Sequence, residues 1–130
     1  MGLRFPANAN TKLVNTNLVH SVDTIVLVTD PIDVTTDSPL VMLVWYAAVS
    51  LGLGDNALTV QLFREADASG ALVNSGPMMN FTAHTTVTVT GSFTDRPGEI
   101  AGQQYSLILT AGGGLADSTV LEGCFAAIAL

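Results

Sequence analysis

The sequence predicts an all-β fold, an antiparallel sandwich of about eight strands, and three observations support it. Hydrophobic residues make up 48% of the 130 residues, and several runs alternate apolar and polar residues with the two-residue period of a strand. Turn signals rich in Gly, Pro, Asn and Asp separate these runs, roughly every 10–15 residues. No segment longer than a turn repeats with the 3.6-residue period of a helix. We therefore expect one domain over residues 13–130, preceded by a short arm at residues 1–12.

The final stretch, Ser118–Leu130, predicts a central strand because it is apolar on both faces. Strict alternation divides it into two faces: Val120, Cys124, Ala126, Ile128 and Leu130 on one, and Leu121, Phe125, Ala127 and Ala129 on the other. One face requires the domain's own core as its cover. We expect a neighbouring subunit to cover the other.

The remaining strands are expected where β-branched and aromatic residues concentrate between turn signals. In chain order they cover residues 13–22 (a weak pattern), 23–29, 32–39 (a short edge strand or a loop), 40–50, 57–64, 71–73, 84–94 and 103–110. The run Leu40–Ser50 is continuous enough for a helix, but its branched and aromatic residues and the glycines after it favour a strand. Pro31 and Pro39 have no backbone N–H to donate, so we expect them at edges or in turns.

Alternation also groups the side chains of the four long runs into faces. The side chains expected to share one face of their strand are Val41, Leu43, Trp45, Ala47 and Val49; Leu58, Val60 and Leu62; Val87, Val89 and Phe93; and Tyr105, Leu107 and Leu109. On the opposite face of the run 84–94 the expected residues are Thr86, Thr88, Thr90 and Ser92. The segment Asp95–Gly98 contains the residue types of a turn.

The charge of the chain is low and negative, which excludes several partners. Charged residues make up 12% of the sequence, and the net charge is −7 with only four Lys and Arg residues. Nucleic acid and anionic membranes both require clustered cations, so we expect neither as a partner. A surface with few charges is more typical of a chain that is buried in an oligomer.

No residue constellation predicts catalysis, and we expect a protein that is not an enzyme. Cys124, the single cysteine, lies in an apolar strand without a neighbouring histidine, which favours a buried, inert thiol over a nucleophile. The two histidines, His20 and His84, are far apart and form no His-x-His cluster. No G-x-S-x-G turn is present. We also expect no export, because the first residues lack an apolar signal core.

Two weaker motifs predict neither a nucleotide nor a metal site, and we expect no cofactor. Gly52-Leu53-Gly54, followed by Ala57, matches the dinucleotide fingerprint in letters, but a strand rather than a helix follows it. The local cluster of carboxylates consists of Asp23, Asp30, Asp33 and Asp37. Its spacing does not match a calcium-binding loop, and aspartate is an ordinary turn residue. A surface cation in the Asp30–Asp37 loop stays open as an alternative.

The last two strands resemble those of a known family. The stretch Gly123–Leu130 is similar to the closing strand of the tumour-necrosis-factor/complement superfamily, with an aromatic residue, small residues and an aliphatic end. The stretch Gln104–Leu109 resembles its penultimate Tyr-x-Leu strand. This resemblance implies a jelly roll of eight to ten strands that forms trimers around apolar inner strands.

Bacteriophage virion proteins share that architecture, and the chain resembles capsid decoration proteins and fibre heads in size and composition. The resemblance implies a homotrimeric decoration or head-stabilising protein that acts by binding. It would be made in the host cytoplasm and reside in the virion, on a major capsid protein or another virion protein. The alternative is a glycan- or receptor-binding head domain of a fibre or spike.

Two sets of residues are the candidates for these contacts. The subunit interface is expected to use Trp45, Tyr46, Leu121, Phe125, Ala127 and Ala129. Leu3 and Phe5, in the N-terminal arm, are the candidate anchors of a tether to the partner. The alternative for this arm is a loose terminus.

Overall fold

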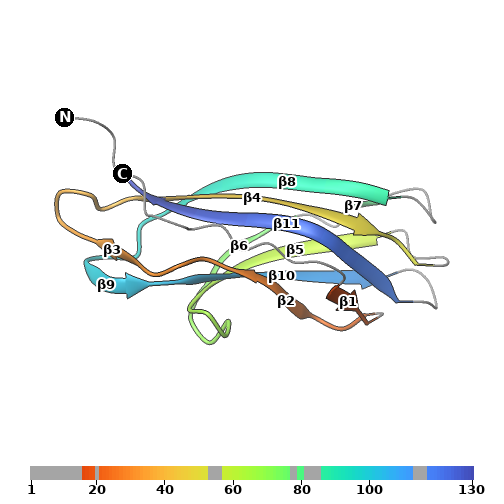
Figure 1. Cartoon of the computed structure of the whole chain (residues 1–130). Helices are drawn as coiled ribbons and strands as arrows, with labels where there is room; N and C mark the ends of the chain where they lie inside the picture. The colour runs from red at the N-terminus through yellow and green to blue at the C-terminus, as the bar shows by residue number, and fades with distance from the viewer. Residues whose placement is uncertain (1–15, 20, 53–56, 77–78, 81–85, 113–116) are drawn as a thin grey trace.

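The chain forms strands throughout the ranges that the computed structural model describes, residues 16–19, 21–52, 57–76, 79–80, 86–112 and 117–130 (Figure 1). The strands are β1 (Thr16–Leu18), β2 (Thr24–Val28), β3 (Ile32–Val34), β4 (Val41–Ser50), β5 (Ala57–Arg64), β6 (Leu72–Ser75), β7 (Met79–Asn80), β8 (Thr86–Asp95), β9 (Ile100–Gln103), β10 (Tyr105–Gly112) and β11 (Ser118–Ala129). Within these ranges no helix is long and apolar enough to cross a membrane.

The strands pair into two layers and one small ribbon. Sheet A has the order β1-β11-β4-β8, and sheet B has the order β2-β10-β5-β6, with β7 also paired to β5. All of these pairs are antiparallel. Figure 1 shows the two layers face to face, with the β3–β9 ribbon at one end. The predicted all-β antiparallel sandwich of jelly-roll type is confirmed.

The long strands lie close to their predicted ranges, and the differences between prediction and structure concern short strands. β4, β5, β8 and β10 begin and end within two residues of the predicted bounds. The sequence did not predict β9, because its residues Ile-Ala-Gly-Gln do not alternate. Its strand conformation depends on pairing with β3, where Ile32 opposes Gln103 and Val34 opposes Ile100. The predicted arm, residues 1–12, lies outside the described residues.

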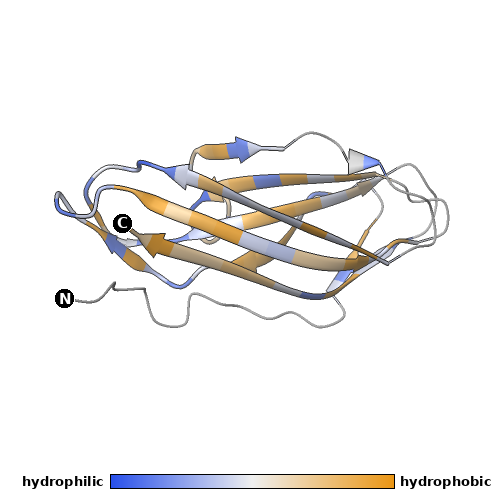
Figure 2. Ribbon diagram, turned by 90° about the horizontal axis from the view of Figure 1, so that it is seen from above, coloured by the Kyte–Doolittle hydropathy of each residue, from blue (hydrophilic) through white to orange (hydrophobic). Residues whose placement is uncertain are grey.

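The core fills the space between the sheets with the faces that alternation predicts. Its fully buried side chains include Val41, Leu43, Ala47 and Val49 of β4, Leu58 and Leu62 of β5, and Tyr105, Leu107 and Leu109 of β10. Figure 2 shows the apolar residues distributed along these strands. Strand alternation therefore identifies the buried faces of β4, β5, β8 and β10 correctly.

Trp45 occupies the inner face of sheet A between its two neighbouring strands. Its ring meets Phe125 of β11 edge to face, with centroids 6.5 Å apart and ring planes at 84°. On the other side Trp45 opposes Gly91 of β8. A Cβ atom at Gly91 would collide with the indole ring, so a residue without a side chain is needed there.

A bulge in β11 corrects the predicted faces of the last strand. The pairing with β4 is Val120 to Val49, but Glu122 then pairs with Ala48, so Leu121 is the extra residue. The extra residue reverses the alternation that follows. Val120 and Phe125 are both fully buried in the core, so the prediction that Val120 shares a face with Cys124 was wrong.

A partly buried ion pair joins the two sheets at one end of the sandwich. Arg64, the last residue of β5, donates from Nε to Asp95 Oδ2 at 3.0 Å and from Nη2 to Oδ1 at 2.9 Å. Asp95, the last residue of β8, is 7% exposed. Tyr105, the first residue of β10, donates its hydroxyl to Asp95 Oδ2 at 2.8 Å. The carboxylate of sheet A is thus held by two donors from sheet B.

These contacts shift the pKa values of all three groups. Burial raises the pKa of Asp95, but the hydrogen bonds from Arg64 and Tyr105 outweigh burial and hold that pKa below its ordinary value. Burial and the bond to Asp95 raise the pKa of Tyr105 well above its ordinary value. The bond to Asp95 likewise raises the pKa of Arg64. The cluster therefore stays ionised as a pair and hydrogen-bonded at neutral pH.

Candidate interaction surface

The outer face of sheet A carries an apolar patch at its centre. On β4 and β11 every second side chain points away from the core, and cross-strand pairs bring these side chains together. We call this surface the outer patch; it consists of Met42, Val44, Tyr46, Ala48, Cys124, Ala126 and Ile128. Its pairs are Cys124 with Tyr46, Ala126 with Val44, and Ile128 with Met42. None of these seven side chains is fully buried, and Val44 is 36% exposed.

A row of hydroxyl groups borders the outer patch on β8. The exposed side chains of β8 are Thr86, Thr88, Thr90, Ser92 and Thr94. This row lies directly beside β4, because Thr90 opposes Tyr46 and Ser92 opposes Val44. Hydroxyl groups donate and accept hydrogen bonds without carrying charge, so the row extends the neutral surface.

Charge is nearly absent from this side of the molecule. Among the described residues that face outward on β4, β8 and β11, Glu122 is the one charged side chain, and it lies at the bulge. The chain as a whole has net charge −7. The carboxylates are therefore concentrated elsewhere, and sheet A presents a face that two like-charged chains can approach.

The centre of the outer patch is slightly hollow. The hollow has a volume of about 190 Å³, and its lining is Val44, Trp45, Tyr46, Thr90, Cys124 and Ala126. These residues come from all three strands β4, β8 and β11. Such a surface can bind an apolar side chain of a partner.

The structure places the predicted interface residues on both faces of sheet A. Trp45 is 8% exposed, and Phe125 and Ala127 are fully buried, all three within the chain's own core. Ala129 packs against that core from a partly buried position. Tyr46 is the aromatic residue of the predicted interface set that lies on the outer face of sheet A.

Leu121 and the arm residues complete the set. Leu121 is the half-buried extra residue of the β11 bulge. Leu3 and Phe5 lie outside the described residues. The predicted interface set did not include Val44, Ala126 and Ile128 of the outer patch. For Val44 the signal was in the sequence, because alternation places it on the face opposite Val41, Leu43 and Trp45. The outward position of Ala126 and Ile128 depends on the bulge in β11.

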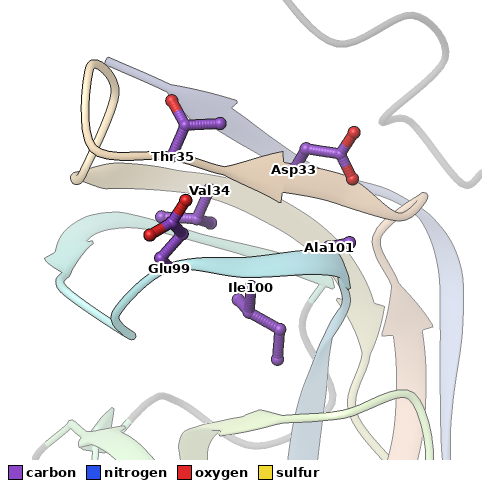
Figure 3. A pocket seen from close by; sticks show the side chains of 6 residues that line it. All are labelled: Asp33, Val34, Thr35, Glu99, Ile100 and Ala101. Atoms are coloured by element: carbon purple, nitrogen blue, oxygen red, sulfur yellow. The ribbon is translucent and has the colours of Figure 1, made fainter.

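The β3–β9 ribbon carries a second hollow, of about 330 Å³, lined by Asp33, Val34, Thr35, Glu99, Ile100 and Ala101. Figure 3 shows the carboxylates of Asp33 and Glu99 lying apart rather than converging. Asp33 Oδ1 accepts a hydrogen bond from the Gly102 backbone N–H at 2.9 Å, which holds the carboxylate to the ribbon. Within the described part of the chain, no three His, Cys, Asp or Glu residues form a group that could hold a metal ion.

The chain is similar to known proteins in its fold and not in its sequence. No family model matches the chain, and no curated protein matches it. Among solved structures, the T13 viral particle of infectious bursal disease virus matches with a TM-score of 0.61 and 10% identity over 93% of this chain. The Gx strain of that virus matches with a TM-score of 0.58 and 11% identity over 98% of this chain.

These matches concern the fold, and they cover part of a longer protein. The chain spans 31% of the matched chain in the T13 particle and 32% of that in the Gx strain. A xylan-binding module matches less well, with a TM-score of 0.47 and 14% identity over 96% of this chain. The sandwich is therefore similar to domains found in viral particles.

Proposed function

We propose that this chain is a structural protein of a virus particle, a homotrimeric decoration or head-stabilising protein that acts by binding. The observation that carries the proposal is the neutral outer face of sheet A, with its apolar outer patch. The similarity of the fold to domains in viral particles supports the same class of protein. Phage origin, the trimer and attachment to a major capsid protein are parts of this proposal. Catalysis plays no part in it.

The outer patch supplies the free energy of self-association. Burial of roughly 250 Å² of apolar surface per chain at about 25 cal/mol per Å² contributes about 6 kcal/mol. Loss of translational and rotational freedom offsets a large part of this gain. In a threefold ring each chain contacts two neighbours through two different surfaces, so the outer patch of one chain would contact another surface of the next chain.

The first experiment measures the mass of the full chain by light scattering at micromolar concentration. We expect three times the chain mass of 13.5 kDa. Val44→Lys places a charge in the centre of the outer patch, where a partner would bury it without a counter-ion, so we expect this variant to be monomeric. A monomeric wild-type chain would contradict the trimer.

The matched control is Gln61→Lys on the outer face of sheet B. Gln61 is a partly buried, outward-facing residue of β5, and the substitution adds the same charged side chain to the other sheet. We expect Gln61→Lys to remain a trimer. If both variants keep the wild-type mass, the outer patch is not the interface.

The second experiment tests the particle itself. An antibody against the chain, visualised by gold labelling in electron micrographs, should decorate the surface of viral particles from cells that produce the protein. Particles that carry no label, while the chain stays in the soluble fraction, would contradict a decoration role and leave the trimer measurement unaffected.

A further inference from the structure

The outer edge of β8 is a long edge that lacks the usual protection against strand pairing. β8 pairs with β4 along all of its 10 residues without a bulge. No described strand pairs with its other side. Natural edge strands are protected by charged residues, prolines, bulges or short length. From Thr86 to Thr94 the strand contains no charged residue and no proline.

We propose that this edge pairs with the same edge of a second copy, antiparallel, around a twofold axis at Thr90. In such a pair directly opposed side chains lie on the same face, so residues of equal parity must oppose each other. Centring the axis on Thr90 opposes Thr86 with Thr94, Thr88 with Ser92, and Thr90 with itself on the outer face. On the inner face it opposes Val87 with Phe93 and Val89 with Gly91.

This register is self-complementary on both faces. The outer face joins hydroxyl to hydroxyl, and cross-strand Thr and Ser pairs stabilise antiparallel sheets. The inner face joins apolar residues, and Val87 and Phe93 already pack against the core from partly exposed positions. The sheets A of two copies then form one continuous sheet, and the unpaired backbone groups of each β8 gain partners.

A cavity between the sheets lies beside the same edge. Its volume is about 200 Å³, and its lining is Trp45, Val60, Asn74, Gly76, Val89, Thr90, Gly91 and Ser92. The inner side chains of an added strand would extend over this cavity. In the proposed register Val89 of the second copy lies opposite Gly91, the position without a side chain. Val89 of the second copy would thus lie over the edge of this cavity.

The electrostatics favour a second copy at this edge despite the net charge of −7. The nearest charge at the end of β8 is Asp95, which Arg64 neutralises in a bidentate pair. Interactions between more distant exposed carboxylates are screened over about 10 Å at 0.1 M salt. The contact does not use the outer patch, so a chain can form both contacts, and either one can fail without the other.

Cysteine cross-linking tests the register. In a background of Cys124→Ser, Thr90→Cys places two thiols directly opposite each other at the axis, within the Cα separation that a disulfide allows. Ser92→Cys is the matched control on the same strand and face, because the two copies of residue 92 would be about 13 Å apart. We expect about tenfold more disulfide-linked dimer with Thr90→Cys than with Ser92→Cys under mild oxidation.

A mixture of two variants gives a second measurement if Thr90→Cys does not fold. Thr88→Cys and Ser92→Cys, each in the Cys124→Ser background, should form a mixed disulfide when combined and little dimer alone. Circular dichroism establishes that each variant is folded. Absence of the mixed disulfide, or equal dimer formation by Thr90→Cys and Ser92→Cys, would overturn the proposed pairing. Neither result depends on whether the outer patch forms a trimer.

Discussion

Tyr105 donates its hydroxyl to Asp95 Oδ2 at 2.8 Å, and this bond connects the first residue of β10 in sheet B to the last residue of β8 in sheet A. Tyr105 is fully buried. Arg64 completes the cluster from β5 and neutralises the carboxylate. The two sheets are thus joined by a charge-assisted bond in addition to apolar packing, at the end where the strands of both layers meet.

Tyr105→Phe should destabilise the fold by about 1.5–3 kcal/mol, the usual contribution of a hydrogen bond to a charged group. The ring remains in the core, so the change isolates the hydroxyl. Urea unfolding followed by circular dichroism measures the difference. Ser106→Ala, at the next residue, is the matched control: its buried Oγ has no hydrogen-bond partner within the described structure, so we expect a smaller change.

Acid should remove the contribution of Asp95 to stability. The folded-state pKa of Asp95 lies below its ordinary value, so the group stabilises the fold above the ordinary pKa of about 3.9. That contribution is lost as pH falls through the lowered pKa. Asp95→Asn should therefore be less stable than wild type at pH 7 and show a smaller loss below pH 4. An equally steep loss in both proteins would contradict this role.

Gly91→Ala should destabilise the sandwich by about 1–3 kcal/mol, because the added methyl group collides with the Trp45 ring and the core must shift. Thermal unfolding measures the effect. In the double variant Trp45→Phe/Gly91→Ala a smaller ring replaces the indole, so the added methyl group should lower the free energy of unfolding by less. If the cost is the same in both backgrounds, the collision is not its cause.

Phe125→Ala and Ile128→Ala compare the two faces of β11. Phe125 is fully buried, so truncation should cost about 3–5 kcal/mol. Ile128 is half-buried in the outer patch, so its truncation should cost less in the free chain and should weaken self-association instead. Urea unfolding and light scattering separate these effects. The reverse ranking of stabilities would contradict the bulge at Leu121.

Chelation should leave the melting temperature unchanged. Asp33 is already hydrogen-bonded to the backbone of Gly102, and in Figure 3 its carboxylate lies apart from that of Glu99. Scanning calorimetry with and without EDTA measures this directly. A fall of many degrees with EDTA would show that the Asp30–Asp37 loop binds a cation.

The sequence by itself determined the long strands and most of their faces. Alternation along β4, β5, β8 and β10 depends only on the residues of each strand, because successive side chains point to opposite sides whatever the neighbour is. The all-β class and the inward-facing position of Tyr105 followed from it, whereas Trp45, expected at the subunit interface, lies in the chain's own core. The low charge of the chain also predicts an oligomer, and this stays a prediction.

Only the tertiary structure decided the features that depend on register between distant strands. The bulge at Leu121 exists because β11 pairs with β4 with one extra residue, and no local pattern reveals that residue. β9 becomes a strand through its pairing with β3. Asp95 meets Arg64 and Tyr105 because two sheets bring their ends together. Alternation is a property of one strand, whereas register, bulges and inter-sheet pairs arise between strands.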